Sequence, residues 1–560
     1  MSTSTRSGRF GRRTMIPVAA VAVAGIAGSA ALMAGCGSSA SAGSAPASIA
    51  GYIPAQSPLY LQVSTDTSGP QWTNLERLGA MFPGFGSMRA DLEKALSREG
   101  VNWEREVQPL LGEAGAMAVT DIPEAGNALE GALTNPAAAA GRAAAKAADT
   151  PVMAVLQIAP GKAGDLKALI AKNPGGLKET GTRDGATLYA DPVAGMYGAI
   201  TEESLVIGSS EAVVNQSLEA HAAGGDAVLS GVFRFNDALA KLPDDVFAMG
   251  YVNLDEAGKA ASEVVPQVGT LAGGELRGAA AMSVTAEQDG LRMKAVLVDA
   301  PPMARQMAYT PTLTRQAPAD AVAYLGFNRL ADTVATAVSS ASGEGSEETK
   351  KQIDAITGQL PLLLGVSTDD LRNLTGGEHA VVVTGPGATP RAALALTVQD
   401  GARAAKSLTS LSRTIPVALG QFGPDSLKVG KATAFAEGGV KGQVIPMGEG
   451  RSVAWGVRGD LAAIGNGAGA VAGVLAQRPA ATSLASAPGF TAATAGMPDQ
   501  VSGLAYIDMT RATRLMAQNG AFEGKDGARM RANLAPISHV AGWSTDGEVP
   551  TVEVVVGMRK

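Results

Sequence analysis

The chain has 560 residues, of which 46% are hydrophobic and 17% are charged, and its formal net charge is −7. This composition is too apolar for a disordered protein, and the acidic balance excludes a nucleic-acid partner because phosphate binding requires a basic surface. The single cysteine excludes a disulfide within the chain and any cysteine-rich metal site.

The first 35 residues form a segment for export. Four arginines, at positions 6, 9, 12 and 13, precede an uncharged apolar stretch that runs from Met15 to Gly35. The stretch ends in Leu-Met-Ala-Gly before Cys36, which resembles the lipobox of bacterial lipoproteins, although Met33 stands where a branched aliphatic residue is usual. The resemblance implies cleavage before Cys36 and attachment of diacylglycerol to its thiol. The alternative is an uncleaved transmembrane helix.

Residues 36–51 are predicted to be a flexible tether, because Cys36 is followed by a run of Gly, Ser and Ala. Two or more acyl chains, palmitate among them, would give stable anchoring to the membrane. Removal of the four arginines of residues 1–35 leaves a net charge of −11. The body would then not bind anionic lipid by itself. The export route, Sec or twin-arginine, is left open.

The sequence of the body predicts an internal duplication, with homologous halves at residues 52–303 and 317–560 and a linker at 304–316. Equivalent landmarks recur in one order in both halves. Those of the first half are Pro54–Tyr60, Gly100–Glu104, Gly112-Glu113, Val152–Leu156, Leu205–Gly208, Gly250–Asn253 and Ala295–Val298. Those of the second are Pro318–Tyr324, Gly365–Asp369, Gly377-Glu378, Ala393–Leu396, Ala462–Gly465, Ala505–Asp508 and Val552–Val556.

Each half is predicted to be α+β, with a mainly antiparallel sheet and packed helices. Strands near 187–190, 195–198 and 205–207 follow one another through turns and predict a meander. Helices are expected near 161–172, 212–220, 402–411 and 470–476, and from Ser87 to Gly100. Residues 124–150 form an Ala-rich insertion in the first half, interpreted as an exposed helical excursion.

The start of the body carries a recognisable pattern. Tyr52-Ile53-Pro54-Ala55, then Leu59–Val63, Asp66, Ser68-Gly69, Gln71 and Phe82–Phe85, resembles a bacterial domain-of-unknown-function family, the one numbered thirty-three fifty-two. Members are similar in length and are exported or membrane-anchored, so the resemblance covers most of the chain. It implies no activity, cofactor or catalytic residue. Because Pro58 cannot donate to a sheet ladder, the first strand is expected to begin after it.

Candidate sites for chemistry are few. Gly465–Ala470 follows a strand and opens a helix, as in a dinucleotide fingerprint, but no acidic residue follows at the required distance, and the matching Gly208–Glu211 has no fingerprint. We therefore interpret it as a strand–turn–helix of the fold. His221, His379 and His539 are isolated in the sequence and predict neither a metal site nor a catalytic triad.

Paired carboxylates are the remaining candidate. Glu113 and Glu378 occupy equivalent places in the predicted repeat, as do Asp255 and Asp508. Such pairs could face each other across a pseudo-twofold axis and share a proton or a cation. The alternative is that each carboxylate satisfies backbone donors at a turn. Asp244-Asp245 is interpreted as a solvated turn.

Taken together, the sequence predicts a non-enzymatic cell-envelope lipoprotein with a binding or structural role at the outer face of the membrane. Its expected partners are the membrane, through lipidated Cys36, and an envelope protein. No cofactor, metal or catalytic residue is predicted. The alternatives are a solute-binding lipoprotein of a transporter and an extracytoplasmic hydrolase with a site between the halves.

Overall fold

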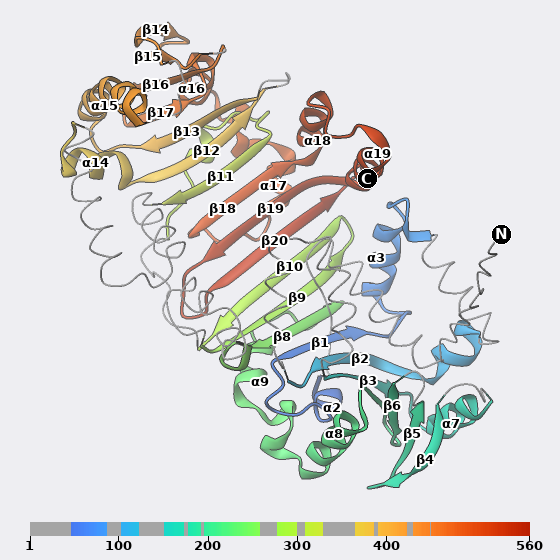
Figure 1. Cartoon of the computed structure of the whole chain (residues 1–560). Coiled ribbons are helices and arrows are strands. Elements are labelled where there is room, and N and C mark those ends of the chain that lie inside the picture. Colours follow the sequence, from blue (N-terminus) through green and yellow to red (C-terminus); the bar gives the residue numbers. More distant parts are fainter. Residues whose placement is uncertain are drawn as a thin grey trace, which may run out of the picture.

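The structure, a computed structural model, describes residues 46–86, 102–121, 151–172, 177–191, 195–257, 277–299, 308–328, 365–385, 390–422, 429–448 and 450–559. Within these residues the chain is α+β, as predicted, and twenty strands join in one antiparallel sheet (Figure 1).

One end of the sheet is formed by residues before position 300. Its strands lie side by side in the order β4 (Lys178–Arg183), β5 (Ala186–Asp191), β6 (Met196–Ile200), β7 (Ser204–Gly208), β3 (Val152–Ile158), β2 (Leu111–Val119), β1 (Leu59–Ser64), β8 (Ala248–Asn253), β9 (Ala279–Glu287) and β10 (Gly290–Val298). The predicted meander is therefore confirmed in β5, β6 and β7, and β1 begins directly after Pro58.

The sheet continues without a break into the rest of the chain through the pairing of β10 with β20. From there the order is β20 (Thr551–Met558), β19 (Ile537–Thr545), β18 (Gly503–Asp508), β11 (Ala323–Asn328), β12 (Glu378–Thr384), β13 (Arg391–Thr397), β17 (Leu461–Gly465), β16 (Ser452–Arg458), β15 (Val440–Pro446) and β14 (Thr433–Glu437). Figure 1 shows β14 and β4 at opposite ends of this sheet.

Helices cover both faces of the sheet. One face carries α2 (Pro46–Ala50), α8 (Glu211–Ala223), α9 (Phe233–Leu239), α16 (Ala468–Leu475) and α17 (Pro488–Ala493). The other carries α3 (Pro70–Gly79), α7 (Ala163–Ala171), α14 (Thr368–Thr375), α15 (Gly401–Phe422), α18 (Met509–Gln518) and α19 (Gly524–Leu534). The expected helices near 161–172, 212–220 and 470–476 correspond to α7, α8 and α16, whereas α15 is longer than the predicted 402–411.

Short helical turns complete the described structure. They are the π-helical η1 (Trp103–Val107) and the 3-10 turns η2 (Gln108–Leu110), η3 (Gly225–Ala227), η4 (Leu229–Gly231), η5 (Leu313–Arg315), η6 (Ala480–Thr482) and η7 (Leu484–Ser486). The predicted helix at 87–100 and the Ala-rich insertion at 124–150 lie outside the described residues.

The core is divided into clusters because helices pack on both faces. The largest two surround Tyr60 and Tyr251 under α2, α8 and α9, and Tyr324 and Tyr506 under α16 and α17. The all-buried strand β7 explains why Leu205-Val206-Ile207 reads as a continuous apolar run, since both of its faces are covered.

Two predicted boundaries need correction. Residues 46–51 belong to the body and not to the flexible tether, because Ile49 and Ala50 of α2 are fully buried in the first core. Similarly, the predicted linker at 304–316 includes Tyr309, which bridges to Val501, and Leu313, which is 1% exposed. Isolated apolar residues among Pro, Ala and Thr carry no periodicity, so their burial could not be recognised from local sequence.

Candidate functional site

Glu113 and Glu378, predicted to occupy equivalent places, hold different places on their strand ladders. The β1–β2 ladder runs from the pair Leu59↔Val119 to the pair Ser64↔Ala114, and the β11–β12 ladder runs from Ala323↔Val383 to Asn328↔Glu378. The place that Glu378 holds on the second ladder is therefore held on the first by Ala114, and not by Glu113. Strand β2 is irregular between Leu111 and Gly115, and Glu113 lies in this irregular stretch, exposed to solvent. An ungapped alignment cannot register such an irregularity.

The two glutamates also lie far apart. Eight strands separate β2 from β12 in the sheet. At about 4.8 Å per strand, nine spacings give a separation of about 40 Å along the sheet. Glu113 and Glu378 therefore cannot share a proton or a cation.

Glu378 instead holds a segment of the chain in place. Its side chain is 7% exposed and accepts hydrogen bonds from the backbone N–H groups of Thr312 and Leu313, both at 2.9 Å, and from the Thr312 hydroxyl. Burial raises the pKa of Glu378, and these donors oppose that rise. The carboxylate thus satisfies the first donors of turn η5, which is the structural alternative weighed for this residue.

Two buried tyrosines lie beside this carboxylate. Burial and the nearby Glu378 raise the pKa of both Tyr309 and Tyr324. Gly326 makes room for them, because a Cβ there would lie 2.7 Å from the Tyr309 hydroxyl and 2.9 Å from that of Tyr324. In the first core, the Tyr60 hydroxyl donates to Gln62, a buried side chain on the same strand. Each core therefore contains buried tyrosine hydroxyls beside a polar side chain, Glu378 in one and Gln62 in the other, within otherwise apolar surroundings.

The pairing of Asp255 with Asp508 is also wrong. Leu59 pairs with Val252 and Ala323 pairs with Ile507, so Asn253 holds the place relative to β1 that Asp508 holds relative to β11. Both are caps: Asp508 accepts from the Arg511 N–H at 2.9 Å, and Asn253 accepts from the Glu256 N–H at 3.3 Å. Asp255 forms an ion pair with Arg234 and accepts from the Gly278 N–H at 3.0 Å. Asp244 and Asp245 are both exposed, as expected for a solvated turn.

The three histidines lie in separate places and are used in packing. His221 stacks on Tyr52 with ring centroids 3.8 Å apart. His379 is buried, with Nε2 3.1 Å from the carbonyl oxygen of Leu374, and His539 Nδ1 lies 3.0 Å from the Ser538 hydroxyl. Burial lowers the pKa of His379 and of His539, which keeps both rings neutral near pH 7.

The glycine-rich segment 465–470 has a packing role. Gly465 ends β17, and α16 begins at Ala468 and lies close to the strand end, where a Cβ on Gly465 would be 3.1 Å from the Ala470 Cβ of α16. Gly208 ends β7 in the same way, and a Cβ there would be 2.9 Å from a Val214 methyl group on α8. The glycines therefore allow a helix to fold back on its strand, as the strand–turn–helix interpretation predicted.

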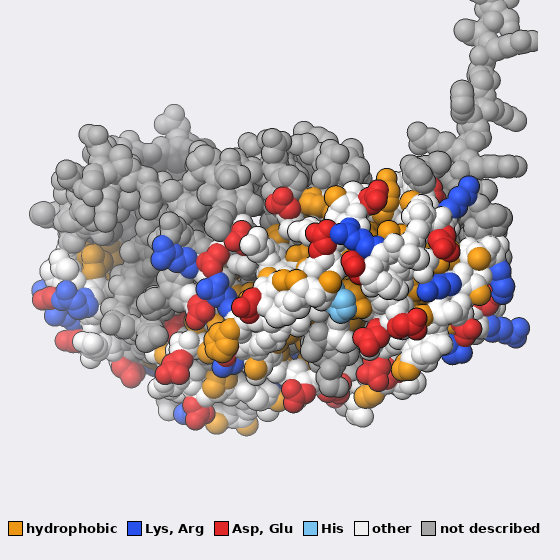
Figure 2. Space-filling model, turned by 90° about the horizontal axis from the view of Figure 1, so that it is seen from below, with side chains coloured by type: hydrophobic (Ala, Val, Ile, Leu, Met, Phe, Trp, Pro, Cys, Tyr) orange, Lys and Arg blue, Asp and Glu red, His pale blue; other side chains and the backbone are white. Residues whose placement is uncertain are grey.

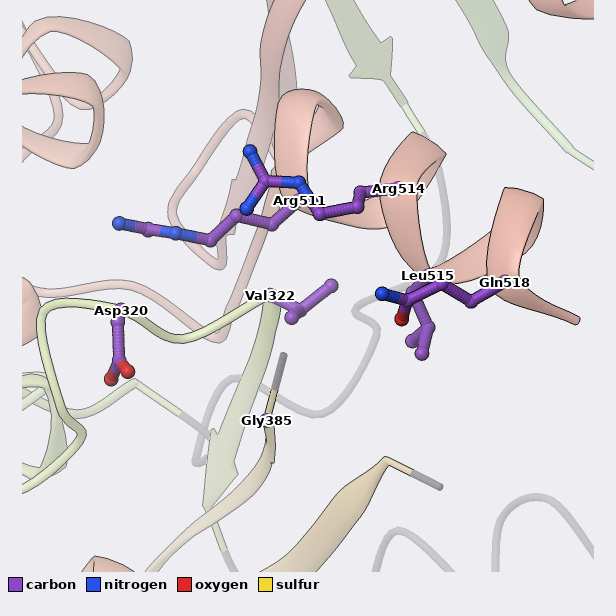
Figure 3. Close-up of a pocket in the computed structure, with 7 residues that line it drawn as sticks. All are labelled: Asp320, Val322, Gly385, Arg511, Arg514, Leu515 and Gln518. Atoms are coloured by element: carbon purple, nitrogen blue, oxygen red, sulfur yellow. The ribbon is translucent and has the colours of Figure 1, made fainter. Parts of the chain in front are cut away.

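A small hollow between α18 and the start of β11 is the first of two further candidate sites (Figure 3). It has a volume of about 180 Å³ and is lined by Asp320, Val322, Gly385, Arg511, Arg514, Leu515 and Gln518. Arg511 is engaged, since it donates to the Ala319 carbonyl oxygen at 3.1 Å and pairs with Asp508 at 2.8 Å. Arg514 lies one helical turn further on and is exposed. The sequence did not predict this hollow, because its lining comes from three segments far apart in the chain, and no local pattern indicates that they meet.

A second hollow, of about 450 Å³, lies between α14 and α15 and includes Asp370, Arg403 and Lys406. Arg403 pairs with Asp370 at 2.6 Å. Among the described residues, no group of three or more His, Cys, Asp or Glu side chains is placed to hold a metal ion. On the face shown in Figure 2, acidic and basic side chains are interspersed and do not form a patch of one sign.

Cys36 lies outside the described residues. In the described part of the chain, helix length and hydropathy together identify no helix able to cross a bilayer.

Comparison with known proteins identifies the family. The model of the family described as "Protein of unknown function (DUF3352)" matches residues 16–535, so the chain belongs to this family and the resemblance expected from residues 52–85 is confirmed. No curated protein matches the sequence.

Among solved structures, crystal form III of TP0453 is 10% identical with a TM-score of 0.25, over 45% of this chain and 81% of that one. Crystal form I of TP0453 is 11% identical, also with a TM-score of 0.25, over 46% of this chain and 80% of that one.

Proposed function

We propose that this member of the DUF3352 family is a lipoprotein of the cell envelope, anchored through Cys36, with a non-enzymatic body that acts by binding or as a structural component. The observation that carries the proposal is the basic and apolar segment that ends in Ala34-Gly35-Cys36. The first described residue is Pro46, at the start of α2. Nine residues, 37–45, lie between Pro46 and the lipidated thiol, and the ten residue-to-residue steps span at most about 35 Å. The anchor would therefore keep the body close to the outer face of the membrane.

We further propose that the body consists of two tandem homologous halves. The strand pairings support this. Strand β1 lies between β2 and β8, and β11 lies between β12 and β18. From β3 the sheet continues through β7, β6 and β5 to its edge at β4. From β13 it continues in the same way through β17, β16 and β15 to its edge at β14. The halves would meet at β10 and β20, around a pseudo-twofold axis near the opposed residues Lys294 and Glu553.

This junction argues against the transporter alternative. Seven residue pairs, from Gly290↔Gly557 to Val296↔Thr551, join β10 to β20. Arg292 also pairs with Glu553 at 3.4 Å across the junction. Two lobes that close on a solute require a hinge between them. A continuous ladder is stiff, so the halves are poorly suited to such closure.

The hydrolase alternative is supported even less. Glu378 and Asp508 serve as caps, His379 is fully buried, and half-buried His539 lies beside the Ser538 hydroxyl. A general acid or base must reach the substrate from a cleft, whereas each of these four groups is already engaged by a neighbouring group of the protein.

The experiment that tests the proposal is metabolic labelling with an alkyne fatty acid in a bacterium that expresses the full chain. Wild-type protein should take up the label and fractionate with the membrane, whereas Cys36→Ala should lose the label. Ser38→Ala, two residues along the tether, is the matched control and should keep it. Label that persists in Cys36→Ala would contradict the proposal.

A further inference from the structure

The two outer edges of the sheet differ in their protection against strand pairing. At one end β4 carries Lys178, Glu179 and Arg183, and its ladder with β5 is interrupted between Glu179 and Gly181. Charges and irregularities of this kind prevent edge-to-edge association. At the other end β14 reads Thr-Ala-Phe-Ala-Glu, with a regular ladder to β15 and one charge, at its last residue. Among the described residues β14 pairs with β15 alone, and no other described strand occupies its outer edge.

The turn after β14 determines which backbone groups point outward. Glu437 pairs with Val440 across Gly438 and Gly439, whose φ values of 58° and 79° are those of a type I′ hairpin. The residues flanking a two-residue turn exchange both hydrogen bonds, and the pattern then alternates along the strand. Thr433, Phe435 and Glu437 therefore bond to β15. Ala434 and Ala436 direct their N–H and C=O groups to the open edge.

This edge is complementary to itself. If a second β14 pairs antiparallel about Phe435, Ala434 of each copy lies opposite Ala436 of the other, which forms four backbone hydrogen bonds. Glu437 then lies opposite Thr433, so like charges do not oppose each other. The exposed Ala434 and Ala436 add no bulk that would keep the strands apart.

We propose that β14 is an interaction surface for a second copy of this chain, which pairs with it edge to edge and extends the sheet across a twofold axis. A five-residue edge is smaller than the interfaces of stable dimers, so the association in solution should be weak and concentration-dependent. A shared membrane anchor would raise the effective concentration of the pair, but the strand pairing itself does not rest on the proposed lipidation.

Disulfide trapping in the full chain tests the proposed register. On a Cys36→Ala background, Ala434→Cys and Ala436→Cys chains are oxidised separately and as a mixture. Opposed Cα atoms of a bonded pair are about 5.5 Å apart, within disulfide range. Two copies of residue 434 would be about 8.7 Å apart, because they are offset by two residues, and this is too far. We expect crosslinked dimer in the mixture and little in either variant alone.

Proline variants provide the second measurement. Ala436→Pro removes an outward N–H without touching the ladder to β15, so the fold should persist while sedimentation equilibrium shows the dimer fraction lost. Thr182→Pro is the matched control at the β4 edge. Thr182 lies two residues before the Asp184-Gly185 turn, as Ala436 lies two residues before Gly438, so its N–H group also points outward. It should leave dimerisation unchanged. Equal crosslinking in single variants and mixture, a dimer that survives Ala436→Pro, or a wild-type chain that stays monomeric at all concentrations would each overturn the proposal.

Discussion

Glu378→Ala provides a quantitative test of how the second core is built. The change removes the acceptor of two backbone N–H groups, those of Thr312 and Leu313, in a place where the glutamate is 7% exposed. Each buried donor left without an acceptor costs about 1–3 kcal/mol, so the free energy of unfolding should fall by about 3 kcal/mol. Glu378→Gln retains one carbonyl oxygen and should lose about half as much.

The matched control is Glu113→Ala, on the exposed and irregular part of β2, which should change the free energy of unfolding by less than about 0.5 kcal/mol. Urea denaturation followed by circular dichroism measures both variants, with the midpoint compared at constant slope. If the two alanine variants lose the same stability, Glu378 does not hold the segment that contains η5, and the reasoning is refuted.

Two further predictions follow from the site. Arg511→Ala should lower the free energy of unfolding by about 1–2 kcal/mol, because its guanidinium links α18 to the Ala319 carbonyl oxygen and to Asp508, whereas the exposed Arg514→Ala should be nearly neutral in the same urea titration; equal losses would contradict the assigned roles. Because burial lowers the pKa of His379 in the folded state, the unfolded chain binds a proton more readily near pH 6.5, so this contribution to stability is complete above that pH and is lost as the pH falls through it. Thermal unfolding between pH 7.5 and 6 should therefore depend less on pH in His379→Gln than in wild type, and an unchanged pH dependence would show that this histidine is not involved.

The fold could be predicted from the sequence where the signal is local. Short apolar runs separated by turns predict the strands that contain Tyr60 and Tyr324. Runs of the same kind predict the meander from β5 to β7. Helix α7 follows from the spacing of Leu166, Leu169 and Ile170. These features depend on neighbouring residues, which sequence patterns report directly.

The actual partners of the candidate carboxylates could not be predicted from the sequence, because they depend on contacts between distant parts of the chain. Glu113 and Glu378 hold different places on their ladders, and the partner of Glu378 is a turn 65 residues earlier in the chain. The role of Asp508 as a cap was within reach, since an aspartate before a helix with an amphipathic face is typical of an N-cap. The pairing of β10 with β20 joins residues more than 250 positions apart, and no local pattern indicates it.

The most direct test of the proposed function is mass spectrometry of the N-terminal peptide of the full chain isolated from bacterial membranes. The proposal predicts a peptide that begins at Cys36, with diacylglycerol on the thiol and the tether residues Gly37–Ser44 after it. A peptide that spans Ala34 to Gly37 with an unmodified thiol would contradict it.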